Sequence, residues 1–446
     1  MVEPLFSFSG IASGIDTASI VRGLVQIERQ PITRMEKQQT DLRGKQSKLD
    51  TLSGLLSTLQ TKGEALDERT KVLTSSASSS QDDALTVTAD GGASLGTYSI
   101  TVSELAKAER SYSDPFSASD EAGLLTAGTL GITVGSESEI TVDVDANTTL
   151  DSLAAAINAS GADVTAGVLS TDLGYRLQIT GNNTGADQTI AFTGDTGIGL
   201  NLAEVQAAQD AELVVDGFDV SRSTNLITDA ISGVTLDLRA QTTGAAEVTV
   251  QRDPDALADL VQEYVNAYNA VNERVAYELS RDSQEGDSLA SDSTVRTVSR
   301  NLRNTLIDTV DGLSSPYNYL ASIGVSIDRA GKLEFERTEL EEALADDPEA
   351  VSKLLAGDES TSTDGLMALM DETIDQLTNS TDGLITTRKK GIDLRIDNLD
   401  DQIARMELRI GDFEDRIRAE FTAMETAVSL AQGQGAQLAA MLGGLA

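Results

Sequence analysis

The sequence predicts an α+β multidomain protein in which the terminal helices form coiled-coil or bundle domains and antiparallel β domains are inserted between them. Apolar residues recur at helical spacing near both ends of the chain, and in the middle they alternate with a period of two. The chain has 446 residues, of which 40% are hydrophobic, so it can bury several separate cores. Because both helical ends carry apolar stripes, we expect them to lie side by side in an elongated molecule.

Residues 16–73 are predicted to be helical almost throughout. Asp16 is the expected N-cap, and Pro31 is expected to kink or restart the helix after Gln30. Leucines then recur at seven-residue spacing on two neighbouring seams, which are Leu42, Leu49 and Leu56 on one and Leu52, Leu59, Leu66 and Leu73 on the other. The serine-rich residues 75–80 are interpreted as a linker, after which the period changes.

Residues 81–253 are predicted to be mostly antiparallel β structure, long enough for two subdomains. Five short segments alternate apolar and polar residues and are separated by Gly, Asn and Asp. Asp216-Gly217 supplies the positive φ values that a tight hairpin turn needs. One short helix, capped by Thr149, interrupts the strands.

Helix is expected to return at Asp253-Pro254, which supply a cap and a first-turn proline. A second helix is predicted around residues 295–306, followed by a small hairpin over residues 324–336 and a capping box formed by Thr338 and Glu341. The last helix is predicted from Leu384 to about Leu430. Its seam has the alternating spacing of three and four residues that is typical of packed helices: Ile396, Leu399, Ile403, Met406, Ile410, Phe413 and Ile417, then Phe421, Met424 and Val428 after one extra residue.

This C-terminal seam could belong to one helix of a bundle core. Only the N-terminal helix, however, is predicted to be long enough to pack along the whole seam. Paired terminal helices therefore predict self-assembly. Residues 432–446 are small and apolar, and their glycines disfavour an isolated helix, so we expect this tail to be flexible alone and ordered in an assembly. A frayed terminus without function is the alternative.

The composition excludes most catalytic chemistry. The chain contains no Cys, His or Trp, which removes thiol nucleophiles, the Ser-His-Asp triad and the usual zinc sites. A hydrolase based on two carboxylates stays possible in principle, but 72 Asp and Glu residues make any single pair uninformative. We expect no cofactor and no metal.

Charge and hydropathy exclude two classes of partner. The net charge is −39, and residues 72–253 carry 26 acidic against six basic residues, so nucleic acid would be repelled. No stretch reaches the roughly 18 uninterrupted apolar residues of a membrane span, so we expect no membrane insertion. Glu3 and Pro4 stand where a cleavable signal peptide has basic residues, so we expect that any export uses another route.

Two short segments resemble ligand-binding motifs but lack residues that binding requires. Gly10 and Gly14 lack the Lys-Ser/Thr pair of a phosphate-binding loop, and no strand precedes them. Residues 143–154 begin like a calcium loop, but Thr148 replaces its glycine and Ala154 its glutamate, so we interpret them as a strand end that leads into a capped helix.

Four stretches follow one another along the chain: GIASGIDTASIVRGLVQIERQPI near the N-terminus, AELVVDGFDVSRSTNLITDAISGVTLDLRA, LASIGVSIDRAGKLEFERTELEEALADDPEAVSKLLAG, and RIRAEFTAMETAVSLAQGQGAQLAAML near the C-terminus. In this order they resemble the bacterial flagellar filament cap proteins, hook-associated protein type 2. Residues 149–185 are similar to the hook IN motif of flagellin-related proteins. The match spans nearly the whole chain, and residues 114–209 lie where the family varies most.

The resemblance implies a protein without enzymatic activity that forms a homo-oligomeric ring at the filament tip, outside the cell. It implies export by the flagellar type III route, flagellin folding and insertion beneath the ring, and flagellin, the hook-associated junction proteins and a dedicated export chaperone as further partners. A secreted adhesin that uses the β domains is an alternative, although the scarcity of aromatic residues argues against sugar stacking. A hook–filament junction protein is another.

The resemblance also implies domain limits and an assembly surface. The predicted domains are a terminal coiled-coil leg (residues 1–45 and 405–446), a helical bundle (46–75 and 254–404), a β domain (76–113 and 210–253) and an outer β domain with the hook IN-like motif (114–209). The residues predicted at the assembly interface are Ile20, Leu24 and Ile27 on one helix and Ile410, Phe413, Ile417, Phe421 and Met424 on the other. Packing between the two helices of one chain is the alternative for each of them.

Overall fold

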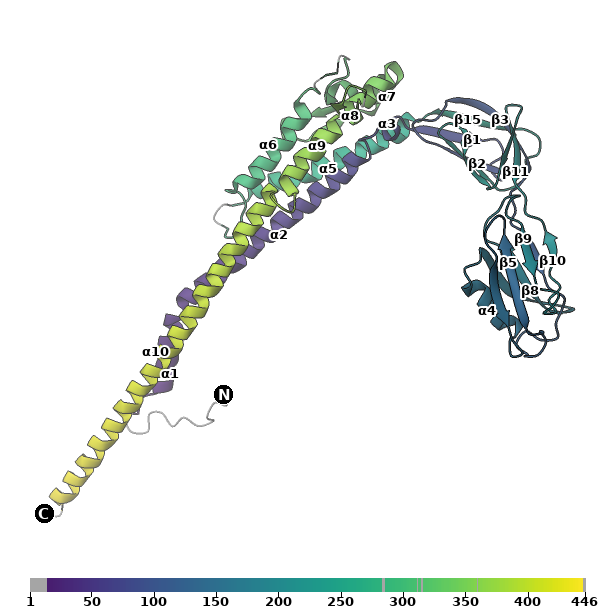
Figure 1. The fold of residues 1–446 in the computed structure, drawn as a ribbon. Helices are drawn as coiled ribbons and strands as arrows, with labels where there is room; N and C mark the ends of the chain where they lie inside the picture. The colour runs from purple at the N-terminus through teal and green to yellow at the C-terminus, as the bar shows by residue number, and fades with distance from the viewer. Residues whose placement is uncertain (1–13, 283–284, 311, 314–315, 359, 444–446) are drawn as a thin grey trace.

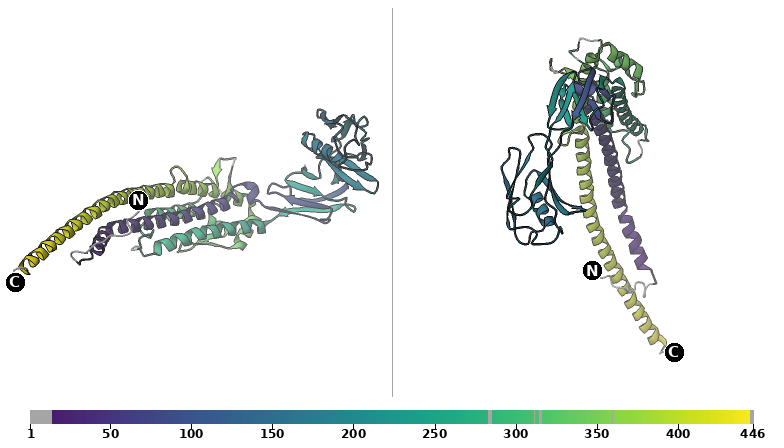
Figure 2. Two further views of the ribbon diagram at one scale, coloured as in Figure 1. Left: turned by 90° about the horizontal axis from the view of Figure 1, so that it is seen from below. Right: turned by 90° about the vertical axis from the view of Figure 1, so that its right-hand side faces the viewer.

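The protein is an elongated helical rod with two β bodies at one end (Figure 1). The structure, a computed structural model, describes residues 14–443 except residues 283–284, 311, 314–315 and 359. The rod runs from the C-terminal end of α10 to α3, and the β bodies bend away from its line (Figures 1 and 2). Terminal helices and inserted antiparallel sheets confirm the predicted fold class.

The rod is built from both ends of the chain. Its helices are α1 (Thr17–Glu28), α2 (Gln30–Glu64), α3 (Arg69–Val72), α5 (Pro254–Ser280), α6 (Ser293–Ile307), the 3₁₀ helix η1 (Leu320–Ile323), α7 (Arg337–Asp346), α8 (Pro348–Ala356), α9 (Leu366–Thr378) and α10 (Leu384–Gly443). Two small hairpins accompany them: β16 (Val325–Ile327) with β17 (Leu333–Phe335), and β18 (Gly357–Asp358) with β19 (Thr363–Asp364).

One continuous core holds the half of the rod that lies near the β bodies. Leu49, Leu52, Leu56 and Leu59 of α2 are buried in a core with α5, α9 and the first part of α10, and α6 joins the same core by packing on α5 and α9. Asp253 caps α5, and its side chain accepts a hydrogen bond from the amide of Ala256. The predicted restart of the helix at Asp253-Pro254 is therefore confirmed.

The inner β body is a sandwich of a five-stranded sheet, in the order β1-β15-β3-β11-β12, and a three-stranded sheet, in the order β13-β14-β2. The strands are β1 (Ser75–Ser79), β2 (Leu85–Ala89), β3 (Gly96–Glu104), β11 (Ala211–Val215), β12 (Phe218–Arg222), β13 (Leu226–Ile231), β14 (Val234–Leu238) and β15 (Ala246–Arg252). Asp216 and Gly217 both have positive φ in the turn between β11 and β12, which confirms the predicted hairpin.

The outer β body has its own core, between a four-stranded sheet, a three-stranded sheet and α4 (Leu150–Ala159). The sheets are β10-β4-β8-β7 and β6-β5-β9, with strands β4 (Arg110–Tyr112), β5 (Gly128–Val134), β6 (Ile140–Val144), β7 (Val164–Thr171), β8 (Gly174–Gly181), β9 (Ile190–Thr193) and β10 (Ala203–Gln206). Thr149 caps α4 in a reciprocal capping box with Ser152. The chain between residues 143 and 154 therefore runs from a strand end into a capped helix, as predicted.

Three local expectations were wrong. Residues 75–80 are not a linker, because β1 pairs with β15 along its whole length. Thr338 does not begin a capping box: the amide of Glu336 still pairs with the carbonyl of Gly324 at the end of the β16–β17 hairpin, so α7 begins at Arg337. The last helix does not end near Leu430 but continues to Gly443. Extending a formed helix costs only about 1 kcal/mol at each glycine, far less than nucleating a new one.

The N-terminal helical region is also less continuous than expected, since Arg29 separates α1 from α2 and residues 65–68 separate α2 from α3. Pro31 lies in the first turn of α2, within one residue of the predicted restart. Among the described residues, none of the helices is long and apolar enough to cross a membrane.

Candidate assembly surface on the terminal helix pair

Residues 17–46 of α1 and α2 run antiparallel to residues 393–443 of α10, and we call these segments the terminal helix pair. Three cross-links fix the alignment: Arg29 with Glu407 at 3.2 Å, Gln39 with Asp400 at 2.7 Å and Gln46 with Asp393 at 2.5 Å. Helices α5, α6 and α9 accompany the opposite ends of α2 and α10, and the C-terminal end of α10 extends past α1 (Figures 1 and 2). The terminal helix pair therefore projects from the bundle.

The first turn of the pair is fixed by its cap. Asp16 accepts a hydrogen bond from the Ser19 hydroxyl at 2.7 Å and one from the Ser19 amide at 3.0 Å. These bonds, the hydroxyl first, hold the pKa of the Asp16 carboxyl below its usual value. The predicted N-cap is thus confirmed, whereas Gly10 and the rest of the glycine-containing lead-in up to residue 13 lie outside the described residues.

The inner seam of the pair is narrow. Its buried apolar residues are Val21 of α1, Ile32 of α2, and Ile396, Leu399 and Ile410 of α10, of which Ile410 is 6% exposed. Gln39 is also buried in this seam, and its amide nitrogen donates to Asp400. A polar residue with one specific partner at such a position fixes the register of two paired helices.

The eight residues predicted at the assembly interface fall into three groups. Ile410 is buried inside the pair, and five others are half-buried: Leu24, Phe413, Ile417, Phe421 and Met424. Ile20 and Ile27 are exposed, by 41% and 61%, on the flank of α1. These two isoleucines are seven residues apart and so lie on one side of the helix. Their part in an interface stays a prediction.

Two exposed leucines on α10 were not predicted from the helical spacing. Leu408 is 74% exposed on α10, and Leu394, two heptads before it, is also exposed. Both residues lie outside the seam of α10. The sequence signal was present, because these are leucines outside the three-and-four spacing, but it is weak since single exposed leucines are common.

An open groove of about 650 Å³ lies along the break between α1 and α2. Ile27 provides an apolar wall, and Arg29 and Arg34 stand beside it; the other lining residues are Gly23, Gln26, Gln30, Thr33 and Lys37. Arg34 makes no ion pair with any described residue. The groove thus offers an apolar contact and spare positive charge to another helix. Within the described part of the chain, no cluster of three or more acidic side chains is placed to hold a metal ion.

Family models match the chain over most of its length. The flagellar hook-associated protein 2 N-terminus matches residues 13–109, the flagellar hook-associated protein 2 C-terminus matches residues 208–433, and the flagellin hook IN motif matches residues 129–199. The C-terminal model alone covers half of the chain. The chain belongs to the flagellar hook-associated protein 2 family.

Relatives and a solved structure agree with this membership. Flagellar hook-associated protein 2 of Escherichia coli K12 is 30% identical over 376 residues, which are 78% of this chain and 80% of the relative. A-type flagellar hook-associated protein 2 of Pseudomonas aeruginosa is 28% identical, with 98% of each chain covered. The crystal structure of the D1-D2-D3 domains of the flagellar cap protein FliD from Escherichia coli superimposes with a TM-score of 0.67 at 29% identity, covering 77% of this chain and 99% of that chain.

The resemblance found in the sequence is therefore confirmed, including the hook IN motif within the outer β body. Flagellar hook-associated protein 2 is a family of structural flagellar cap proteins rather than of enzymes. The match also reaches both helices of the terminal pair, because the two hook-associated protein 2 models start at residue 13 and end at residue 433.

Proposed function

We propose that this chain caps the flagellar filament at its tip, outside the cell, as a homo-oligomeric ring. Membership of a family whose solved member is described as a flagellar cap protein supports this function. The same membership favours capping over the junction-protein and adhesin alternatives. Export through the flagellar type III route, and contacts with junction proteins and an export chaperone, belong to this proposal.

The observation that carries the proposal is the projection of the terminal helix pair away from the bundle with apolar residues uncovered. Ile20 and Ile27 are exposed on α1 and Leu408 is exposed on α10, so both helices of the pair offer apolar side chains to neighbouring molecules. In the proposed assembly, the β bodies form the ring and the rods point toward the filament. Burial of one such isoleucine would contribute about 1.5–3 kcal/mol to a contact.

The proposed cap does not catalyse a reaction on flagellin. Newly exported flagellin folds in the space beneath the ring and packs onto the filament, and the free energy of folding and packing drives insertion. The ring confines the unfolded subunit and prevents its loss to the medium. The terminal helix pairs contact the most recently added subunits and move to the next site as each subunit is inserted.

A strain that lacks the gene tests this proposal. We expect it to have no filaments and to release monomeric flagellin into the medium, and we expect the wild-type gene to restore filaments. The double variant Ile20→Asp/Ile27→Asp should restore them poorly. Leu173→Asp is the control, because Leu173 is also exposed, by 77%, but lies at a hairpin tip of the outer β body. Filaments of normal length in the deletion strain would exclude capping.

A further inference from the structure

The corner between the rod and the inner β body is crossed twice by the chain. Residues 73–75 lead from α3 into β1, and residues 252–254 lead from β15 into α5. The two crossings are bonded to each other: the Asp253 amide donates to the Thr74 carbonyl at 3.0 Å, and the Thr74 hydroxyl donates to the Asp253 carbonyl at 2.5 Å. These bonds hold the two crossings together but do not by themselves set the angle of the corner.

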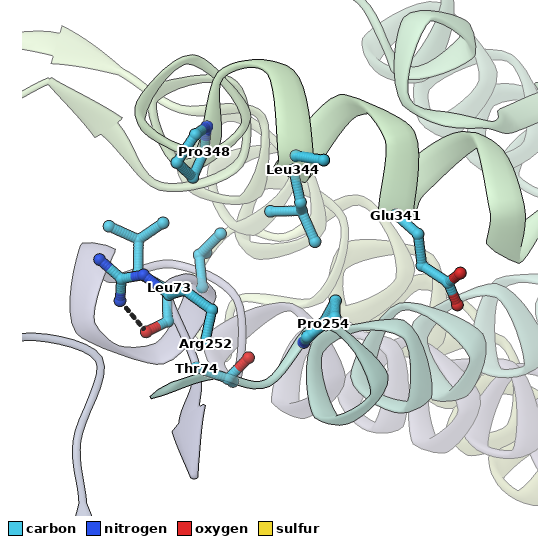
Figure 3. A pocket seen from close by; sticks show the side chains of 9 residues that line it. Leu73, Thr74, Arg252, Pro254, Glu341, Leu344 and Pro348 are labelled. Atoms are coloured by element: carbon cyan, nitrogen blue, oxygen red, sulfur yellow. Dashed lines mark hydrogen bonds between the residues drawn. The ribbon is translucent and has the colours of Figure 1, made fainter. Parts of the chain in front are cut away.

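The Arg252 side chain forms hydrogen bonds with three separate segments. Its Nη1 donates to the carbonyl of Leu73 at the end of α3 and to the carbonyl of Gly91 in the turn between β2 and β3, both at 2.9 Å. The same nitrogen lies 3.3 Å from the Ser75 hydroxyl in β1. Figure 3 shows the guanidinium group directed at the Leu73 carbonyl. One side chain thus links the rod to both sheets of the inner β body.

The turn at Gly91 rests directly on α3. A Cβ atom at this position would lie 2.0 Å from the carbonyl oxygen of Thr70 and 2.5 Å from that of Leu73. Both oxygens belong to the backbone and cannot move out of the way as the end of a side chain can. Only glycine fits there, and the close approach brings the Gly91 carbonyl within reach of Arg252.

On the side that faces α7 and α8, Arg69 of α3 forms an ion pair with Glu349 of α8, but an apolar space beside this pair is unfilled. A cavity of about 290 Å³ separates Leu344 of α7 and Pro348 of α8 from Leu73 and Pro254 (Figure 3). Its lining is mostly apolar and comes from the rod and from the base of the inner β body, and it also includes Val72, Thr74, Arg252, Glu341 and Ala345. The corner is therefore bonded on the Gly91 side and unfilled on the α7 side.

We propose that Arg252 is a positioning residue that sets the angle between the rod and the inner β body, and that the cavity is the space into which the corner closes when Arg252 releases its carbonyls. Hydrogen bonds from a guanidinium group are stronger than those between neutral groups, so one side chain can hold the angle. An unfilled apolar space offers no packing that resists closure. Closure would bring the inner β body toward α7 and α8.

The angle bears on the proposed function, because it fixes how the β bodies are held relative to the terminal helix pair. The inference itself concerns a single chain and does not depend on capping. Its test therefore uses the purified protein under conditions where it is monomeric, and the filament assay tests capping separately.

Distances between two spin labels test the inference. The chain has no native cysteine, so Ser78→Cys on β1 and Glu342→Cys on α7 give one defined pair of exposed sites. We expect a narrow distance distribution when Arg252 is present. Arg252→Met should broaden it and shorten the mean distance, whereas Arg252→Lys should keep most of the original distribution, because an ammonium group can still donate to several carbonyls.

A second variant tests the direction of closure. Ala345→Leu fills the mouth of the cavity, so in the Arg252→Met background it should restore the original distance. If Arg252→Met does not fold by circular dichroism, Arg252→Gln replaces it, since glutamine is too short to reach both carbonyls. An unchanged distribution in the folded variant would overturn the role of Arg252. A shortened distance that Ala345→Leu fails to restore would overturn the role of the cavity.

Discussion

The two halves of the rod use the same helices, α2 and α10, but bury them very differently. Near the β bodies, α2 and α10 have α5, α6 and α9 as neighbours, and Leu49, Leu56 and Leu59 of α2 are fully buried. In the terminal helix pair, α1 and the start of α2 are the only described segments beside α10, and Ile27 and Leu408 are mostly exposed.

This difference teaches that helical spacing predicts a seam but not the number of helices that cover it. The seam of α10 keeps its apolar residues three and four apart from Ile396 to Val428, and only its first residue, Ile396, packs into the bundle core. In the bundle that seam faces several partners, whereas in the terminal helix pair it faces one. Apolar side chains on the flanks then stay in water unless another molecule covers them.

The largest expected effect is a difference in stability between a substitution in the bundle and one in the terminal helix pair. Leu59→Ala in the bundle should lower the free energy of unfolding by about 2–5 kcal/mol, because it leaves a cavity in a packed core. Ile27→Ala in the terminal helix pair should change it by less than about 0.5 kcal/mol, since that side chain is already in water. Urea unfolding followed by far-ultraviolet circular dichroism measures both. Equal effects would mean that the two halves are packed alike.

Alkaline pH should act on the bundle before the terminal helix pair. Burial raises the pKa of Tyr268 to about 12, and it raises the pKa of the fully buried Tyr264 further. Because both folded pKa values exceed the unfolded value of 10.0, their contribution to stability is complete below pH 10 and is lost as the pH rises through about 12.

We therefore expect helical circular dichroism to fall as tyrosinate absorbance appears over this range. Tyr264→Phe/Tyr268→Phe should move the loss of helix to higher pH. The hydroxyl of Tyr264 has no hydrogen-bond partner in the described part of the chain, so its removal should cost little at neutral pH. An unchanged midpoint in the double variant would show that other groups control the alkaline transition.

Within the terminal helix pair, two aspartate substitutions distinguish residues that pack inside one chain from residues that contact another chain. Ile410→Asp places a charge in the buried seam, so amide exchange in α1 should become faster in the monomer. Ile27→Asp should leave amide exchange unchanged but reduce the higher assemblies detected by light scattering. If Ile27→Asp assembles normally, the exposed flank of α1 is not an interface.

The smallest effect concerns ion pairs. Lys48 is largely buried and donates to the Asp287 carboxylate at 2.7 Å and to its carbonyl at 2.9 Å, while Arg29 and Glu407 are both about half exposed. Lys48→Met should cost about 1 kcal/mol, and Arg29→Met about 0–0.5 kcal/mol. The Lys48 bond is also the main cause that lowers the pKa of Asp287, so Lys48→Met should raise that pKa. Acid and urea titrations of both variants measure the difference.

The elements that sequence reasoning located well are those whose signals are local. The Asp16 cap, the Asp216-Gly217 turn and the Asp253-Pro254 helix start all depend on residues within three or four positions. The errors arose where a distant segment decides the structure. The serines of residues 75–79 form a strand because β15 lies beside them, and α7 begins early because a hairpin pairs up to Glu336.

The same distinction holds for the candidate assembly surface. Its apolar residues could be found from their spacing, but Ile410 and Ile27 could not be told apart, because exposure depends on where the neighbouring helix ends. Gln39 gave no apolar signal, and its place in the seam is decided by Asp400, which lies 361 residues later in the chain. The groove at Arg29 exists only because α1 and α2 meet at a break.

By itself, the sequence determined the period of each segment, the caps and turns between them, the absence of thiol and imidazole chemistry, and the resemblance to the flagellar cap proteins. These features depend on residue identity and on short-range geometry. The tertiary structure alone decided which parts of the seams are covered and how the rod meets the β bodies. The burial of the seams and the angle between the rod and the β bodies depend on contacts between residues that are far apart in the sequence. The contacts of Arg252 with Leu73 and Gly91 are an example, and they form only when the chain has folded.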